Sequence, residues 1–156
     1  MKDPLREQLA RILDWSDAHA GLDDALAGIP PNLRGAVAQG AVHSLWQLLE
    51  HMRLAQFDIL DFCLNPDYQE PASMEEYWPK QPAPLSSEAW DKSVASFRSD
   101  LNDLKTLALN ADIDLFAKIP HGDGQTYLRE LLLVADHNSY HLGQIIALRR
   151  QLGIWR

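Results

Sequence analysis

Apolar residues recur at steps of three and four through most of the chain, which is the period of an amphipathic helix. Proline- and glycine-containing stretches such as Gly28-Ile29-Pro30-Pro31 and Asn65-Pro66 interrupt this pattern. No alternating run of β-branched residues competes with it. The sequence therefore predicts an all-α fold of four long helices. We expect these helices to cover about residues 5–27, 44–65, 86–108 and 126–152.

The connections between the helices predict a particular kind of bundle. Residues 66–85 contain five prolines together with Tyr68, Tyr77 and Trp78, which favours a long, ordered crossover without regular structure. Residues 32–42 and 110–125 are shorter connectors. A long crossover between helices 2 and 3 indicates a four-helix bundle of non-simple topology, and we expect one domain over residues 1–156.

Residue types at the helix ends support these boundaries. Ser44 lies three residues before Gln47, which is the spacing of a capping box at a helix start. Gly153 is well placed to end the last helix, and Arg149 and Arg150 complement the dipole in its last turn.

Charge and cysteine content narrow the classes of partner. Fourteen Lys and Arg stand against 22 Asp and Glu, a formal net charge of −8, which argues against a nucleic-acid partner or an anionic membrane surface. The longest apolar run, Leu131 to Ala135, is too short to span a membrane. The only cysteine, Cys63, permits no intrachain disulfide, so we expect a cytoplasmic protein with Cys63 as a buried structural thiol.

Two histidines in the last helix are the first candidates for chemistry. His137 and His141 lie four residues apart and therefore project from one face, close enough to bind a single metal ion. We expect this face to point into the bundle. The alternative is a pair of core histidines, each hydrogen-bonded to a Tyr, an Asp or a backbone carbonyl. The same stripe contains Leu133, Val134, Ile145 and Leu148.

A third histidine favours the metal site. His51 shares a stripe with Leu48, Ala55 and Ile59 on the second helix and should also face the core. Three histidines from two helices leave coordination positions open, which is typical of catalytic rather than structural metal sites. The motifs of zincin proteases and of di-iron carboxylate bundles are absent.

Several neighbouring residues have open roles. We expect His43 to be exposed or to cap a helix, with a place in the metal pocket as the alternative. Tyr140 is expected in the core, or else beside the pocket as a donor to substrate. Asp58, Asp136 and Tyr140 are the nearest candidates for a general base, although carboxylates on a helix flank are usually just solvated.

Two residues after His141 also have a physical interpretation. Gly143 costs about 1 kcal/mol within a helix, so we expect it to allow close approach of another helix. Gln144 either orients a metal ligand or closes a hydrogen bond between helices.

The segment His137-Asn138-Ser139-Tyr140-His141-Leu142-Gly143-Gln144 resembles the H-x-x-x-H-x-G-Q segment of the DinB/YfiT-like superfamily. The segment from His43 to His51 is similar to the one that ends in that family's first metal histidine. The similarity extends over about residues 5–153.

The resemblance implies a metal-binding four-helix bundle, usually dimeric. It implies that His51, His137 and His141 hold a divalent ion such as zinc or nickel. Characterised branches are S-transferases and isomerases that use low-molecular-weight thiols, and other members are labelled metal-dependent hydrolases. Neither His43 nor Tyr77-Trp78-Pro79 corresponds to an assigned activity.

Two functions follow as hypotheses. The first is an enzyme in which the metal activates a thiol or water to attack a small-molecule substrate. The alternative is a non-catalytic metal-binding or structural bundle with a stress-related role. In either case we expect a homodimer, mainly because the resemblance implies one. Five tryptophans in 156 residues support this expectation, because aromatic residues left outside a core favour interfaces. The five are Trp15, Trp46, Trp78, Trp90 and Trp155.

Overall fold

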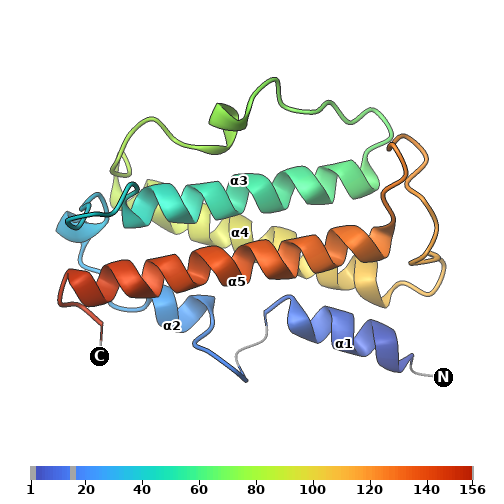
Figure 1. Cartoon of the computed structure of the whole chain (residues 1–156), viewed down its shortest axis with the longest axis horizontal. Coiled ribbons are helices and arrows are strands. Elements are labelled where there is room, and N and C mark those ends of the chain that lie inside the picture. The colour runs from blue at the N-terminus through green and yellow to red at the C-terminus, as the bar shows by residue number, and fades with distance from the viewer. Residues whose placement is uncertain (1–2, 15–16, 156) are drawn as a thin grey trace.

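The protein is all-α, as the sequence predicts (Figure 1). The computed structural model describes residues 3–14 and 17–155. Over these residues, extended structure is limited to one isolated bridge between Lys118 and Thr126. The helices are α1 (Pro4–Ile12), α2 (Leu22–Leu26), α3 (Leu45–Leu64), α4 (Ser87–Leu109) and α5 (Tyr127–Gln151), with short 3₁₀ helices η1 (Pro31–Leu33) and η2 (Met74–Tyr77).

The helices α3, α4 and α5 form the body of the bundle (Figure 1). Helices α3 and α4 run in the same direction, because the segment between them returns along the whole length of α3 before α4 begins. Helix α5 runs in the opposite direction and packs against α3. The predicted crossover is therefore confirmed. Among its described residues, η2 is the only helical element.

The predicted first helix is wrong in its length. Helix α1 ends at Ile12, and α2 begins only at Leu22 and packs against α5. Ser and Asp side chains compete with helical hydrogen bonds, and the intervening segment is rich in them. Asp14 and Asp17 in this segment pair with Lys105 and Arg11. Together, α1 and α2 cover the side of the bundle below α4 and α5 (Figure 1).

The caps that define the long helices agree with the sequence. The Ser44 hydroxyl accepts from the Gln47 amide, and the Gln47 side chain accepts from the Ser44 amide. Gly153 follows α5 with a φ of 69°, in the left-handed region that favours glycine.

Arg149 does more than complement the dipole of α5, the role expected from the sequence. It is buried and donates to the carbonyls of Ala25 and Ala27, so it caps α2 instead of serving only its own helix.

The core lies between α3, α4 and α5, and α1 and α2 close its open side. Fully buried side chains include Leu49 on α3, Leu104 on α4, and Leu131 and Ile145 on α5. Leu133 was expected on the buried stripe of α5 but is exposed.

None of the described helices combines the length and the hydropathy that a membrane span requires.

Candidate metal centre

The three predicted histidines meet between α3 and α5. His51 is 5% exposed and His141 7% exposed, while His137 is half-buried. One ring nitrogen from each lies within 4.8 Å of the other two. Nε2 of His51 lies 3.0 Å from Nε2 of His141 and 3.1 Å from Nε2 of His137. The rings are tilted against one another rather than stacked, so their nitrogens converge.

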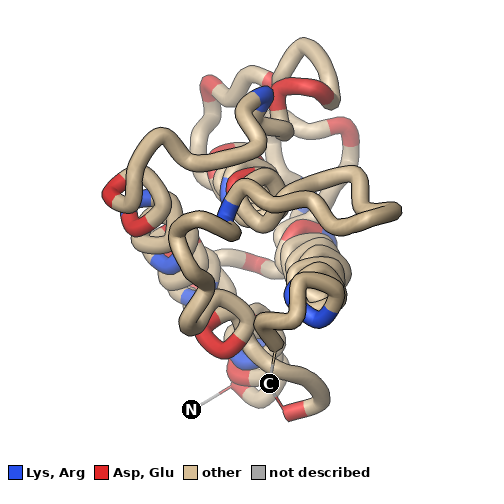
Figure 2. Tube along the Cα trace, turned by 90° about the vertical axis from the view of Figure 1, so that its left-hand side faces the viewer, with Lys and Arg blue, Asp and Glu red and all other residues tan. Residues whose placement is uncertain are grey.

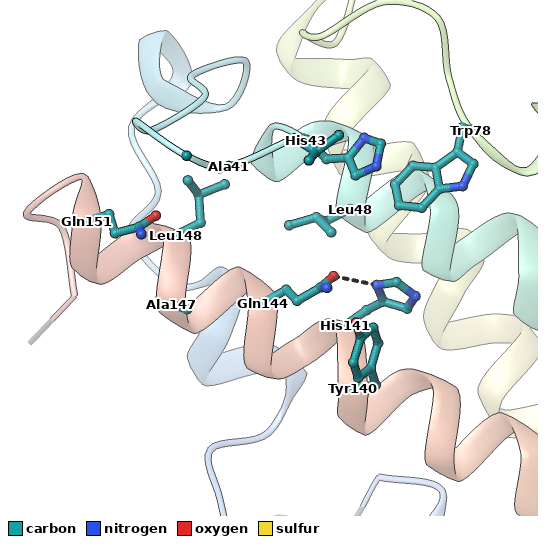
Figure 3. Close-up of a pocket in the computed structure, with 12 residues that line it drawn as sticks. Ala41, His43, Leu48, Trp78, Tyr140, His141, Gln144, Ala147, Leu148 and Gln151 are labelled. Atoms are coloured by element: carbon teal, nitrogen blue, oxygen red, sulfur yellow. Dashed lines mark hydrogen bonds between the residues drawn. The ribbon is translucent and has the colours of Figure 1, made fainter.

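Hydrogen bonds at the outer nitrogens decide which ring nitrogens are protonated. Nδ1 of His51 lies 3.0 Å from the backbone oxygen of Tyr77, and a carbonyl oxygen only accepts. Nδ1 of His141 lies 2.7 Å from Oε1 of Gln144, which also only accepts (Figure 3). In the neutral rings both hydrogens are therefore on Nδ1, and both Nε2 atoms present lone pairs.

Two unprotonated nitrogens 3.0 Å apart cannot hydrogen-bond to each other. Two nitrogen ligands bound at right angles, each about 2.1 Å from one ion, lie about 3 Å apart. The donor set thus fits a divalent cation: neutral imidazoles, with their outer N–H groups held by oxygen acceptors. The alternative of satisfied core histidines is met only in part. Tyr77 accepts from Nδ1 of His51, and Nε2 of His137, 3.1 Å away, can donate to Nε2 of His51. The nearest nitrogen to Nε2 of His141 is the unprotonated Nε2 of His51, which cannot donate to it.

The surroundings keep these rings neutral. Burial lowers the pKa of His51 to about 4, and the neighbouring His141 and His137 add to the effect against an opposing bond from Tyr77. Burial also lowers the pKa of His137 to about 4, with His141 contributing. The pKa of His141 is lowered by burial as well. Neutral imidazole is the form that binds metal, so the site is ready for an ion at neutral pH.

A cavity of about 480 Å³ opens to solvent beside the histidines (Figure 3). His141 and Gln144 form part of its wall, and His43, Trp78 and Tyr140 line it from both sides. A small molecule in this cavity would therefore be next to one of the three histidines.

A comparison with families of proteins agrees with this geometry. The model of the DinB family matches residues 1–156, the whole chain. The chain belongs to the DinB family. The comparisons with curated proteins and with solved structures each gave no significant match. DinB-family membership and the histidine cluster together fit a metal-binding protein.

The crossover of this DinB-family chain covers the histidine cluster, a role that the sequence did not reveal. The indole of Trp78 stacks on His51 at 3.7 Å, with 2° between the ring planes. Its other face stacks on His43, also at 3.7 Å. His43 is therefore half-buried at the cavity, the alternative of the two sequence interpretations, and burial lowers its pKa. The signal available was an aromatic pair, Tyr77-Trp78, within a proline-rich segment.

Asp58 fastens the same crossover to α3. Its two carboxylate oxygens accept from the hydroxyls of Tyr68 at 2.9 Å and Tyr77 at 2.8 Å. Asp58, one of the residues considered as a base, thus has a structural role in which each oxygen accepts from a tyrosine hydroxyl. Asp136, the other carboxylate considered, is exposed, which agrees with a solvated side chain.

The structure agrees with some of the remaining expectations and contradicts others. Gln144 accepts from Nδ1 of His141, a candidate metal ligand, which agrees with one of its two interpretations. Tyr140 is 64% exposed and contacts the edge of His141, so its predicted place in the core is wrong and its place beside the pocket is correct. Gly143 is also exposed, and apart from its chain neighbours and the backbone of its own helix, no described atom lies within 4 Å of the position of an added Cβ. The expected close approach of another helix of the chain is therefore wrong.

Cys63 is buried, as expected for a structural thiol, at 3% exposure. Burial raises its pKa to about 12, and the nearby Glu130 adds to this effect. His19 and His121, to which the sequence gave no role, are exposed. His121 reaches the backbone oxygen of Phe62 at the far end of α3.

Proposed function

We propose that the chain binds one divalent metal ion, zinc or nickel, through His51, His137 and His141. We further propose that this centre activates a low-molecular-weight thiol or water, so that the protein is an S-transferase or a hydrolase for a small organic substrate. The observation that carries the proposal is the pair of unprotonated Nε2 atoms of His51 and His141, 3.0 Å apart beside a cavity.

The residues have separate roles in this proposal. When bound, a divalent ion lowers the pKa of a thiol or water and so supplies a nucleophile at neutral pH. Tyr77 and Gln144 hold the outer N–H groups of His51 and His141, which fixes the direction of their lone pairs. His43 lines the cavity with a neutral imidazole, so one of its ring nitrogens can take the proton that the thiol or water loses.

Metal content and turnover test the two halves of the proposal. Elemental analysis of purified protein should find about one divalent ion per chain, and His51→Ala, His137→Ala and His141→Ala should each reduce it sharply. Full occupancy in all three variants would rule out the site. Turnover should appear in a panel of electrophiles with bacillithiol, mycothiol, glutathione or cysteine, or with simple esters and amides. It should vanish in His137→Ala and fall in His43→Gln without loss of metal.

The second candidate is a metal-binding bundle without catalytic activity. It is favoured by one observation: of the carboxylates considered as bases, Asp58 is held by two tyrosines and Asp136 is exposed. Protein that carries metal but accelerates none of these reactions, and that no thiol stabilises against heat, would support this candidate.

We also propose a homodimer, on the basis of the family resemblance. Trp46 and Trp90 are buried in the core, Trp78 covers His51, and Trp155 contacts Arg149. Trp15 lies outside the described residues. The tryptophans that are described thus pack within the chain, and the proposal depends on the family resemblance. Sedimentation that shows only monomer at micromolar concentration would contradict it.

A further inference from the structure

The cavity beside His141 is made from two segments that carry no charge. Residues 35–49 contain no Asp, Glu, Lys or Arg, although the chain average of 23% would place about three there. Residues 137–148 of α5 are likewise uncharged. Most of the residues that line the cavity come from these two segments, which face each other across it (Figure 3).

The charged residues lie elsewhere on the molecule. Figure 2 looks at this end of the bundle, and the segment that leads into α3 is drawn mostly in tan. Among the described residues, no side chain that lines the cavity is charged. This contrasts with the overall charge of −8. The described side chains of the lining would therefore offer a ligand no ion pair.

The cavity surface is mainly apolar, with a few polar groups. Leu48 and Leu148 form its floor, and the edge of Trp78 forms one side. Both faces of Trp78 are already covered by His43 and His51, so the indole offers a rigid wall. Val42, 81% exposed, and Tyr140, 64% exposed, leave apolar surface in water at its rim. Such surface is favourable to cover with an apolar molecule.

We propose that this cavity selects an uncharged, largely apolar organic molecule as the substrate of the metal centre. The proposal rests on the proposed function, because His141 belongs to both the cavity and the histidine cluster. In the part of the cavity away from the histidines, a carboxylate or an ammonium group would lose its hydration without gaining a charged side chain as partner, which disfavours charged molecules. The volume of about 480 Å³ is within the range of small-molecule sites.

Three probes of one shape and different charge test this selection: 2-naphthylmethanol, 2-naphthoate and 2-naphthylmethylammonium. Each is titrated by calorimetry into the full-length protein, once loaded with zinc and once after removal of metal by a chelator. We expect the neutral alcohol to bind about tenfold or more tightly than either ion in the metal-free protein. Equal or tighter binding of an ion there, or no binding of the alcohol at about 1 mM, would overturn the proposal.

Matched variants locate the binding site. Ala147 lines the cavity from an exposed position on α5, so Ala147→Trp should fill the cavity and weaken binding of the alcohol about tenfold or more. Gln151→Trp, near the end of α5, provides a second filling variant. Ala95→Trp places the same side chain on the exposed face of α4 and should leave binding unchanged. Unchanged binding in both filling variants would contradict the proposed site.

Metal analysis of the same samples separates this inference from the proposed function. Selective binding of the alcohol by protein that never takes up zinc would refute the metal function and leave the cavity's selectivity intact. Stoichiometric zinc with no selectivity among the three probes would refute the selectivity alone.

Discussion

The backbone oxygen of Tyr77 accepts the Nδ1–H of His51 at 3.0 Å, although 26 residues separate the two in the chain. The side chain of the same tyrosine donates to Asp58, two turns further along α3 from His51. Tyr77 therefore connects one histidine of the cluster to the attachment point of the crossover. The position of a segment without long helices thus helps to fix the orientation of a candidate metal ligand.

Loosening this attachment should weaken the metal site. Tyr77→Phe keeps the ring and removes only the hydroxyl bond to Asp58, so the Tyr77 carbonyl should hold His51 less firmly. We expect zinc affinity to fall about tenfold, at the lower end of what outer hydrogen-bond partners contribute. Competition with a chromogenic zinc chelator measures the change. Tyr68→Phe removes the other bond to Asp58 and should have a smaller effect, so an equal or larger loss there would count against this mechanism.

We expect Gln144 to affect zinc affinity through its hydrogen bond to His141 and not through its place in the cavity wall. Gln144→Leu removes the acceptor of the His141 Nδ1–H, and we expect zinc affinity to fall about 10- to 100-fold. Gln144→Glu restores an acceptor and should restore binding. Gln151→Leu changes a second glutamine of the same cavity that is not bonded to a histidine of the cluster, so its affinity should match the wild type. Similar losses in both Leu variants would show that the effect is not transmitted by His141.

The metal-free protein should lose stability in mild acid. The pKa of His51 and of His137 is about 4 in the folded protein, against about 6.5 for histidine in an unfolded chain. Between these values the unfolded chain binds more protons, so the free energy of unfolding should be constant above about pH 6.5 and fall steadily towards pH 4. Urea denaturation at several pH values measures this slope, and His137→Gln should reduce it.

The same low pKa values predict that metal is retained into mild acid. Protons compete with the ion only where the free site titrates, so zinc should remain bound to about pH 5 and leave below it. Release centred near pH 6.5 would show that the imidazoles titrate like exposed ones.

Cys63 should be unreactive in the folded protein. Its pKa of about 12 leaves very little thiolate at pH 8, and burial denies access to reagents. We expect Ellman's reagent to modify native protein about a hundredfold or more slowly than it modifies protein in guanidinium chloride. Fast modification of the native protein at pH 8 would place this thiol at the surface.

Gly143 should be replaceable by alanine at a gain in stability. An added Cβ meets open space, and alanine is favoured over glycine within a helix by about 1 kcal/mol, so Gly143→Ala should raise the free energy of unfolding by about 0.5–1 kcal/mol. In Gly35→Ala, by contrast, the Cβ would lie 2.5 Å from Cβ of Ala83, so stability should fall. Thermal denaturation of both variants provides the comparison. A loss in Gly143→Ala would indicate that a second chain packs against this glycine.

The sequence by itself determined the long helices and the identity of the three histidines. Helical periodicity reports which residues share a face, and the cap residues Ser44 and Gly153 report where helices begin and end. His137 and His141 share a face through their spacing alone, and His51 lies on the buried stripe of α3. The end of α1 at Ile12 could not be predicted in this way. Ser16 and Ala20 continue the helical spacing, but their side chains are too small or too polar to form a strong apolar stripe.

The tertiary structure alone decided what surrounds the histidines. Trp78, Tyr77 and Asp58 reach the site through a crossover without a period, and no local pattern predicts where such a segment lies. The exposure of Tyr140 could not be predicted either, because helical periodicity gives an angle around α5 but not which neighbouring segments cover that side. A local pattern fixes the face of a helix, whereas contacts between distant segments depend on how all the faces are buried together.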